Sequence, residues 1–261
     1  MKRASSEGLV EEGYVTFSMV HYNGPDSAMT PFVDRVHAVA QETFGSVHSF
    51  IADTVHLTWN AGRRICQHET KAASFLCRLR ENVGDPLVTV SGVVASGKGR
   101  FQKAGGTLQA VLVRVDWLPL LHKLYTIAKT HGALLLDKKA NETAKFNMKT
   151  QCVDFVGEPM VFETMVFELL GERESEVQEA GGGEKKGDEW MYILEQREQQ
   201  EGEDAVRIAV TMCKRGEYRE ALEKLATQTG PSAMVRRLEQ KVRRCQERQV
   251  LPERFLHFEF A

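Results

Sequence analysis

The sequence has no apolar run long enough to cross a membrane, no closely spaced cysteine pair and no signal-peptide core. A membrane-spanning helix needs roughly 18–20 apolar residues, and no stretch approaches that length. The five cysteines are scattered and odd in number, which indicates reduced thiols rather than a disulfide framework. The polar N-terminal residues lack the apolar centre of a secretory signal. We therefore expect a cytoplasmic protein, either free or held at a membrane through a larger protein or partner.

The sequence also lacks an excess of charge of one sign. It contains 34 Lys and Arg against 36 Asp and Glu, for a net charge of −2. Nucleic-acid-binding domains usually carry a basic excess, so we expect no nucleic-acid partner. Cys66 and His68 stand two apart in CQHE, but no second pair of metal ligands accompanies them. That pattern indicates a loop rather than a zinc site.

One glycine-rich stretch, SGVVASGKGRF (91–101), is similar to the nucleotide-binding P-loop, G-x-x-x-x-G-K-[ST]. Its last position is Gly99, so the hydroxyl group that would hold Mg²⁺ is missing. A P-loop also runs directly into a helix whose N-terminus faces the phosphate, whereas residues 97–106 show no helix start. The pattern therefore predicts a strand followed by a turn, and not a phosphate loop.

A change in composition divides the chain. Residues 171–188, GERESEVQEAGGGEKKGD, contain three consecutive glycines, many charges and a single large apolar residue, which is typical of a flexible linker. We expect one domain over residues 1–170 and a helical tail over residues 189–261.

The first domain alternates between strand and helix patterns. The order β-α-β-β-α-β, continued by further elements and a final hairpin, predicts an α+β fold with a ferredoxin-like antiparallel sheet covered by helices. Asp53 is expected at the turn of the first hairpin. The expected strands are 13–23, 46–52, 54–61, 87–97, 133–137, 150–158 and 160–171; the expected helices are 30–45, capped by Thr30 and ended by Gly45, 69–84, and 108–132 with Pro119 as a start or kink.

These elements resemble, in the same order, the class III nucleotidyl cyclase homology domain, the catalytic module of adenylyl and guanylyl cyclases. The resemblance covers about 14–170. YVTFSMV is similar to the family's F-[ST]-D-I strand, and GSVHSFIADTVHLTW to its G-G-x-x-x-K-x-x-G-D hairpin. VTVSGVVASG is similar to its V-x-x-G-I-x-x-G strand. GTLQAVLVRV looks like its G-x-x-V-N-x-A-x-R-L helix, and DFVGEPMVFETMVFEL like its closing hairpin.

The resemblance implies a dimer with the active site at the interface, where two Asp residues of one subunit hold two metal ions. An Asn and an Arg on a helix of the other subunit would position the ribose and stabilise the transition state. Carried over by position, the resemblance assigns Asp53 as a metal ligand and Arg114 as the catalytic and nucleotide-binding arginine. Gly106 matches the glycine at the helix start and is also assigned to the nucleotide site. Three other family positions are replaced: the first metal Asp by Met19, a base-reading Lys by Ser49 and the catalytic Asn by Ala110.

These replacements predict weak or absent catalysis. One Asp cannot hold two Mg²⁺ ions against water, and losing a transition-state donor costs roughly 10²–10³-fold in rate. We expect a catalytically degenerate cyclase-like domain that acts as a regulatory or dimerisation module in cyclic-nucleotide signalling, and lean against enzyme activity. Two alternatives stay open: a subunit of a heterodimeric adenylate or guanylate cyclase, and a non-catalytic nucleotide sensor. We expect no cofactor. Mg²⁺ or Mn²⁺ is expected to bind only together with a nucleotide. The expected partner is a second copy or another cyclase domain.

The tail carries a helical pattern. AVRIAVTMCKRGEYREALEKL resembles one tetratricopeptide-like helical hairpin, through the spacing of Gly216, Tyr218 and Ala221. One such unit cannot bury its own apolar face, so we expect it to pack on the first domain or on a protein partner. The last helix is expected to present a solvated basic face. Its basic residues are Arg236, Arg237, Lys241, Arg243, Arg244 and Arg248.

Overall fold

The computed structural model of this protein describes residues 10–104, 110–158, 162–173, 205–228, 231–251 and 255. These residues form two compact units: Met1–Lys149 with Leu169–Glu172, and Thr150–Glu168 with Arg173–Ala261. Most of the expected linker, residues 174–188, lies outside the described residues. Within the described ranges, no helix is both long enough and apolar enough to cross a membrane.

The first unit is built on a mixed sheet in the order β2-β3-β1-β4-β6, and β5 pairs with the end of β4. The β4–β6 pair is parallel, and the other pairs among these strands are antiparallel. The predicted α+β fold, a sheet covered by helices, is confirmed, but the parallel β4–β6 pair makes the sheet mixed rather than wholly antiparallel as predicted. The strands are β1 (Val10–Asn23), β2 (Ser46–Ile51), β3 (Thr54–Trp59), β4 (Thr89–Ala104), β5 (Ala110–Arg114) and β6 (Leu134–Asp137).

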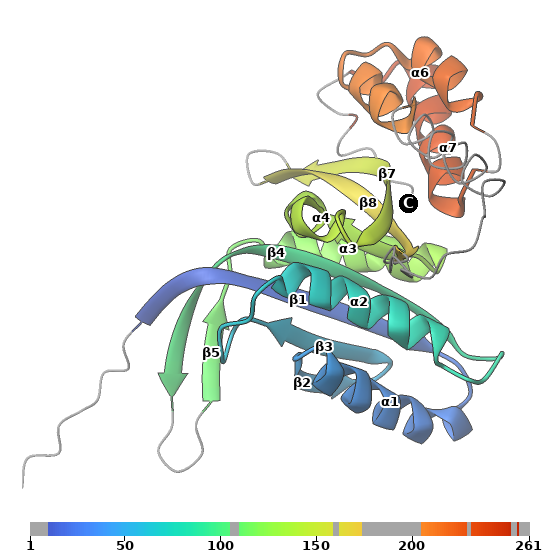
Figure 1. Ribbon diagram of the computed structural model, residues 1–261. Coiled ribbons are helices and arrows are strands. Elements are labelled where there is room, and N and C mark those ends of the chain that lie inside the picture. The colour runs from blue at the N-terminus through green and yellow to red at the C-terminus, as the bar shows by residue number, and fades with distance from the viewer. Residues whose placement is uncertain are drawn as a thin grey trace, which may run out of the picture. The chain divides into compact units, whose positions relative to one another are not determined.

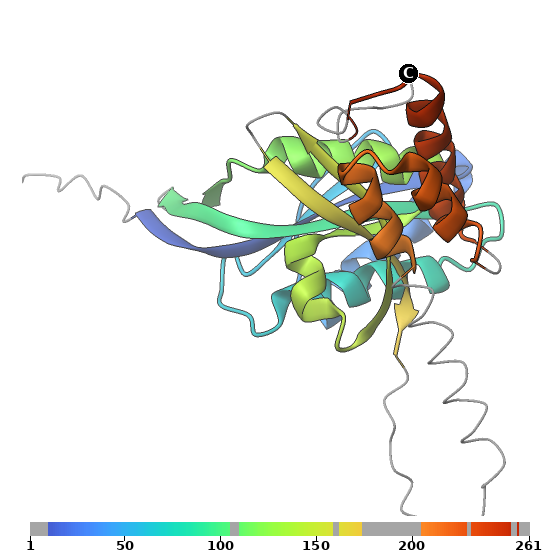
Figure 2. The ribbon, with the colours of Figure 1, turned by 90° about the horizontal axis from the view of Figure 1, so that it is seen from above.

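Helices cover both faces of this sheet, as Figures 1 and 2 show. Because side chains alternate along a strand, neighbours on β1 face opposite helices. Thr16 meets His68 of α2, whereas the ring of Phe17 packs edge-on against Trp117, just before α3. The helices of this unit are α1 (Met29–Glu42), preceded by the short helix η1 (Asp26–Ala28), α2 (His68–Glu81), α3 (Leu118–His131) and α4 (Lys138–Ala144).

The turn predicted after Gly97 is wrong. β4 runs unbroken for 16 residues and pairs with β1 from Thr89 to Gln102. Gly97 is needed for packing, because a Cβ atom there would collide with the indole ring of Trp117. No helix follows Lys98, so the structure agrees with the sequence that this stretch is not a phosphate loop.

The prediction of a helix over 108–132 is correct for the second half of this range and wrong for the first. Residues Ala110–Arg114 form strand β5, and the helix starts at Leu118, with Pro119 in its first turn. The segment AVLVRV is rich in β-branched residues, and the long β4 offers it an edge to pair with. Gly106 lies outside the described residues.

The second unit combines a hairpin with helices. The hairpin strands are β7 (Met148–Glu158) and β8 (Phe162–Glu172); the helices are residues 205–214, α6 (Tyr218–Leu225) and α7 (Ala233–Glu247). This grouping differs from the division expected at residue 170, because most of the hairpin packs with the helices. Asp154 of β7 is fully buried against Arg237 and Lys241 of α7.

Two basic residues of α7 therefore do not belong to the solvated face that the sequence predicted. The Nζ atom of Lys241 donates to Oδ1 of Asp154 at 3.1 Å and to the carbonyl oxygen of Phe155 at 3.3 Å, and Arg237 donates to Oδ2 of Asp154. Burial opposes the charge on Asp154, but Lys241 and Arg237 outweigh it and keep the pKa of this carboxyl below its ordinary value. The ion pairs fix α7 to β7.

Candidate functional site

Asp53 lies at the β2–β3 turn, as the hairpin pattern predicted. Its backbone carbonyl accepts a hydrogen bond from the amide of Tyr22 at 2.8 Å, which anchors the turn to β1. Ala52 just before it has a positive φ of 52°. The Asp53 side chain is about two-fifths exposed. The turn therefore holds the carboxylate in place beside β1 without burying it.

Three side chains surround the Asp53 carboxylate. Lys129 donates from Nζ to Oδ2 at 2.9 Å, and Thr54 donates from Oγ1 to Oδ1 at 3.0 Å. Nδ1 of His21 lies 3.2 Å from Oδ2. The hydrogen bond from Lys129 lowers the pKa of Asp53, and burial followed by the charge of Lys129 lowers the pKa of His21. Asp53 is thus an ionised carboxylate beside an ammonium group.

Helix α3 contributes two members of this cluster. Tyr125 and Lys129 are four residues apart, so both lie on one side of α3, where Tyr125 is half-buried and Lys129 is exposed. The hydroxyl group of Tyr125 is 2.5 Å from Oγ1 of Thr54, and its ring lies 6.4 Å from that of His21. The helix therefore contacts the β2–β3 turn through two polar side chains, and Lys129 reaches the carboxylate itself.

This arrangement does not fit a pair of hard metal ions. Met19, where the resemblance places the first metal ligand, is 4% exposed and presents a thioether, which Mg²⁺ does not prefer. Among the described residues, no three His, Cys, Asp or Glu side chains gather as metal ligands. The one carboxylate at the turn is already neutralised by Lys129. We derive no metal-dependent step from these residues.

Arg114 lies elsewhere in the first unit. It is the last residue of β5, it is exposed, and it stands opposite Arg100 in the β4–β5 register. Nε of Arg100 is 3.1 Å from the carboxylate of Glu12, whereas no described carboxylate forms an ion pair with Arg114. In this chain Arg114 is thus an exposed cation at a strand end, and not a residue of a helix.

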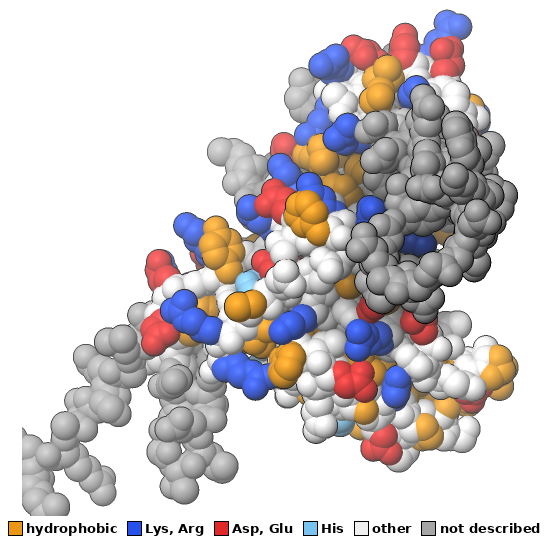
Figure 3. Space-filling view, in the orientation of Figure 1, with side chains coloured by type: hydrophobic (Ala, Val, Ile, Leu, Met, Phe, Trp, Pro, Cys, Tyr) orange, Lys and Arg blue, Asp and Glu red, His pale blue; other side chains and the backbone are white. Residues whose placement is uncertain are grey.

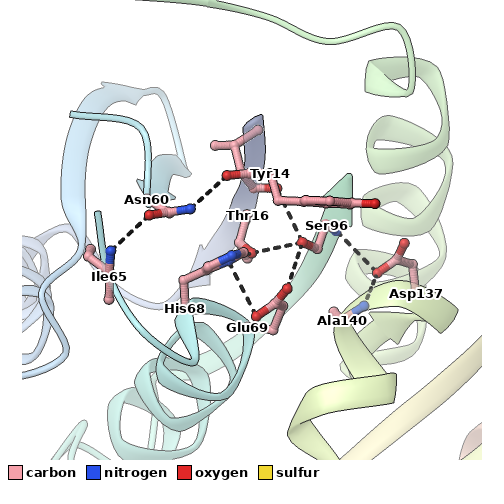
Figure 4. Close-up of polar contacts among 10 residues, drawn as sticks. Tyr14, Thr16, Asn60, Ile65, His68, Glu69, Ser96, Asp137 and Ala140 are labelled. Atoms are coloured by element: carbon pink, nitrogen blue, oxygen red, sulfur yellow. Dashed lines mark hydrogen bonds and ion pairs between the residues drawn. The ribbon is translucent and has the colours of Figure 1, made fainter. Parts of the chain in front are cut away.

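A second polar cluster lies under α2, on the opposite face of the sheet (Figure 4). Nδ1 of His68 is 2.7 Å from Oγ1 of Thr16, which donates to Oγ of Ser96 at 3.1 Å. Ser96 can donate in turn to Glu69 at 3.3 Å or to the carbonyl of Val15 at 3.2 Å. The chain of hydrogen bonds joins α2, β1 and β4.

The His68 cluster is not a nucleophilic triad. A triad needs the hydroxyl group and the carboxylate on opposite ring nitrogens of the histidine. Here Thr16 and Glu69 both approach Nδ1, the carboxylate at 3.4 Å. Burial lowers the pKa of His68, which favours the neutral ring. The cluster therefore satisfies buried polar groups rather than activating one.

Asp137 extends this network without a cation. It caps α4 by accepting from the amide of Ala140 at 2.8 Å, and it accepts from the amide of Ser96 at 3.2 Å. Burial raises the pKa of Asp137 to about 7, because backbone amides only partly replace water around the charge. Asp137 thus holds β4 and the start of α4 together.

The sequence predicted one member of the Asp53 cluster and missed the rest. Lys129 and Tyr125 lie 72 or more residues from the turn in sequence, and no motif connects them with it. The one available signal was that both lie on a helix otherwise lined by buried leucines, such as Leu121 and Leu124. Polar side chains beside such a stripe need a partner, but only the fold identifies which partner.

The surface of the protein carries no large field of one sign in the view of Figure 3. Lys and Arg side chains are interspersed with Asp and Glu. This agrees with the near-zero net charge, and it offers no extended basic face for a nucleic acid on the side shown.

Solved structures with the same fold are adenylyl and guanylyl cyclase domains. The chain is similar to the adenylyl cyclase CyaB from P. aeruginosa, with a TM-score of 0.55 and 10% identity over 64% of this chain and 98% of that one. It is also similar to the guanylate cyclase domain of RhGC from Catenaria anguillulae in complex with GTP, with a TM-score of 0.51 and 13% identity over 62% of this chain and 100% of that one.

A third similar structure is the non-canonical dimeric guanylyl cyclase domain of the RhoGC fusion protein from the aquatic fungus Blastocladiella emersonii, with a TM-score of 0.52 and 14% identity over 62% of this chain and 99% of that one. No protein-family model matches the sequence, and no curated protein matches it. The protein thus has the fold of an adenylyl or guanylyl cyclase domain, and at these identities the similarity shows the fold alone.

Proposed function

We propose that this chain is a catalytically degenerate cyclase-fold domain that acts as a regulatory or dimerisation module in cyclic-nucleotide signalling. The observation that carries the proposal is the ion pair between Lys129 and Asp53. The Nζ atom lies 2.9 Å from Oδ2, so an internal ammonium group neutralises the carboxylate that the resemblance assigns to the metal. A metal ion would have to displace that amine and would find Met19 in place of a second carboxylate.

The helix order supports the same conclusion. The resemblance places the Asn and Arg that position the ribose on a helix, whereas their matched positions, Ala110 and Arg114, lie on strand β5. Here the first helix after β5 is α3, LPLLHKLYTIAKTH, which contains neither Asn nor Arg. The transition-state donors expected on that helix are therefore absent from it, which should bring a homodimer close to background rate.

The test is a cyclase assay on the purified protein. ATP and GTP are each incubated with Mn²⁺ or Mg²⁺, and the cyclic products are measured by mass spectrometry against a buffer blank. We expect no product above the blank for the parent chain or for Asp53→Ala. Turnover well above the blank that is lost in Asp53→Ala would overturn the proposal.

The regulatory part needs its own measurement. Sedimentation of the chain, alone and mixed with an active cyclase domain, reports whether a homodimer or a heterodimer forms. We expect association, together with a changed activity of the added domain. A monomer under all conditions, with no effect on the added domain, would contradict the dimerisation role.

A second candidate is a subunit of a heterodimeric adenylate or guanylate cyclase, and Arg114 favours it. Like charges directly opposite each other on paired strands are destabilising, yet Arg100 and Arg114 face each other. Glu12 neutralises Arg100 only, so Arg114 is available to an anion from outside the chain. If a partner domain supplied both metal carboxylates, mixing would produce cyclase activity, and Arg114→Ala would abolish it. Activity that is unchanged in Arg114→Ala would exclude this candidate.

A further inference from the structure

The end of α1 contains a backbone conformation that its sequence does not favour. The amide of Gly45 donates to the carbonyl of Ala40 at 2.7 Å, and that of Phe44 to Gln41 at 3.2 Å. This pair of hydrogen bonds is the Schellman motif, in which the residue after the C-cap takes a left-handed conformation and is usually glycine. Here that residue is Phe44, with a φ of 62°. The prediction that Gly45 ends the helix was thus one residue off.

Packing explains why a glycine stands at position 45, one residue after the left-handed position. A Cβ atom on Gly45 would approach the ring of Trp59 to 2.8 Å, so this position accepts no side chain. It does not explain the phenylalanine at position 44. A bulky residue is strained in the left-handed region, and the ring of Phe44 is 45% exposed, so little burial offsets that strain.

What Phe44 does contact is a pair of cations. The guanidinium carbon of Arg63 lies 4.8 Å from the ring centre, and Nζ of Lys71 lies 4.4 Å from it. No described carboxylate forms an ion pair with either residue. The ring therefore holds two positive charges close together with no negative group to neutralise them, an arrangement that an anion would stabilise.

Phe44 and Arg63 line a cavity of about 540 Å³, which lies within the usual size range of small-molecule sites, and Lys71 lies beside it over the ring of Phe44. Its wall combines Phe44 and Ile65 with neutral polar groups from Gln41, Ser46 and Asn60. Asn60 is itself fixed: its side chain donates to the carbonyl of Tyr14 at 2.8 Å and accepts from the amide of Ile65 at 2.8 Å (Figure 4). The loop that carries Arg63 is therefore held in a defined shape.

The neighbouring cavity shows what distinguishes this one. It shares Asn60 and Arg63, has a volume of about 310 Å³, and is also lined by Glu11, Glu12 and Arg64. Two carboxylates on its wall make that cavity unfavourable for an anion. The larger cavity has no acidic residue in its lining.

We propose that the cavity lined by Phe44 and Arg63, with Lys71 beside it over the same ring, binds a small phosphomonoester whose organic part is polar and of sugar size. A phosphomonoester carries a charge of about −1.5 to −2 at pH 7, which matches two unpaired cations. The neutral polar wall suits hydroxyl groups. The site is separate from the Asp53 cluster: β1 holds Asn60 at Tyr14 and Asp53 at Tyr22, eight residues or roughly 26 Å apart along the strand.

The test is a titration with ribose 5-phosphate, followed by the amide NMR signals of Phe44, Gly45 and Ser46. Ribose and inorganic phosphate serve as separate probes. We expect saturable shifts with ribose 5-phosphate, weaker binding of inorganic phosphate and none of ribose. Equal affinity for ribose 5-phosphate and inorganic phosphate would overturn the assignment of a sugar-sized group. No saturable shift with any probe would overturn the site.

Two matched variants make the test specific. Arg63→Gln removes a cation from the cavity, and Arg64→Gln removes the neighbouring cation, which lines only the smaller cavity. Losing a charge-assisted hydrogen bond should weaken binding roughly 10- to 100-fold in Arg63→Gln, whereas Arg64→Gln should keep its affinity within about threefold. Equal weakening in both would show a diffuse charge effect and overturn the proposal.

Phe44→Gly separates binding from stability. Glycine suits the left-handed position, so the variant should melt no lower than the parent while it loses the binding of ribose 5-phosphate. A variant that melts no lower and keeps parental affinity would contradict the role of the ring.

Discussion

Asp53 and Asp154 each form an ion pair with a lysine, but the two pairs lie in very different surroundings. Asp53 and Lys129 keep 42% and 44% of their side chains exposed, whereas Asp154 and Lys241 keep 0% and 1%. In water the gain from such a pair is small, and in a dry interior a charge without its partner is strongly unfavourable. The buried ion pair at Asp154 therefore stabilises the fold. The exposed ion pair at Asp53 contributes little stability, and its main effect is to neutralise the carboxylate.

A third carboxylate completes the comparison. Asp137 is nearly as buried as Asp154, but only backbone amides donate to it. Burial raises its pKa to about 7, whereas the cations around Asp154 keep the pKa of that carboxyl below its ordinary value. Burial alone therefore does not decide whether a carboxyl is charged; the presence of a cation does.

The largest expected effect is at the buried pair. Arg237→Met removes one cation from Asp154 and leaves the buried carboxylate undercompensated, which should lower the free energy of unfolding by about 3–5 kcal/mol in urea titrations. The matched control is Arg236→Met, the neighbouring exposed residue of α7, which should change stability by no more than about 0.5 kcal/mol. Similar losses in both variants would show that Asp154 does not depend on Arg237.

The next effect concerns Asp137, whose pKa is about 7 in the folded protein and 3.8 as its ordinary value. A carboxyl group whose folded pKa is raised favours the folded state below pH 3.8, and this contribution is lost as the pH rises through 7. Asp137→Asn keeps the acceptor for Ser96 and Ala140 but carries no charge.

Between pH 4 and pH 8, the stability of Asp137→Asn relative to the parent should therefore rise by about 4 kcal/mol, measured by urea unfolding at each pH. The exposed Asp34→Asn variant controls for the loss of one negative charge. A relative stability of Asp137→Asn that does not change with pH would show that Asp137 is solvated or paired in the folded protein.

The smallest effect on stability is expected at the exposed pair. Lys129→Met should leave the urea midpoint close to that of the parent, since exposed ion pairs contribute little. The pKa of Asp53 should rise toward its ordinary value, because the hydrogen bond from Lys129 is the main cause of its lowering. A carboxyl-carbon NMR titration measures this pKa, and Lys129→Arg should keep it low. An unchanged pKa in Lys129→Met would mean that the two side chains are not paired in solution.

Local patterns predicted much of the fold. The hairpin around Asp53, the helices now seen as α1 and α2, and the strand at 133–137 all follow from side-chain periodicity and turn residues, which act over a few neighbouring residues. The elements that were wrong depend on distant partners. Residues 110–114 form a strand because β4 offers an edge, and residues 97–102 stay extended because β1 pairs with them.

The candidate sites divide in the same way. The sequence by itself determined that Asp53 stands at a hairpin turn, and its resemblance to the cyclase domain assigned Met19 to the position of a metal ligand and Arg114 to that of a transition-state donor. The tertiary structure alone decided that Lys129 reaches Asp53, that Arg237 and Lys241 neutralise Asp154, and that Arg63 and Lys71 meet over Phe44. The physical reason is that hydrogen-bonded turns and strand patterns are set by adjacent residues, whereas the state of a charge depends on whichever group the fold brings within a few ångströms of it.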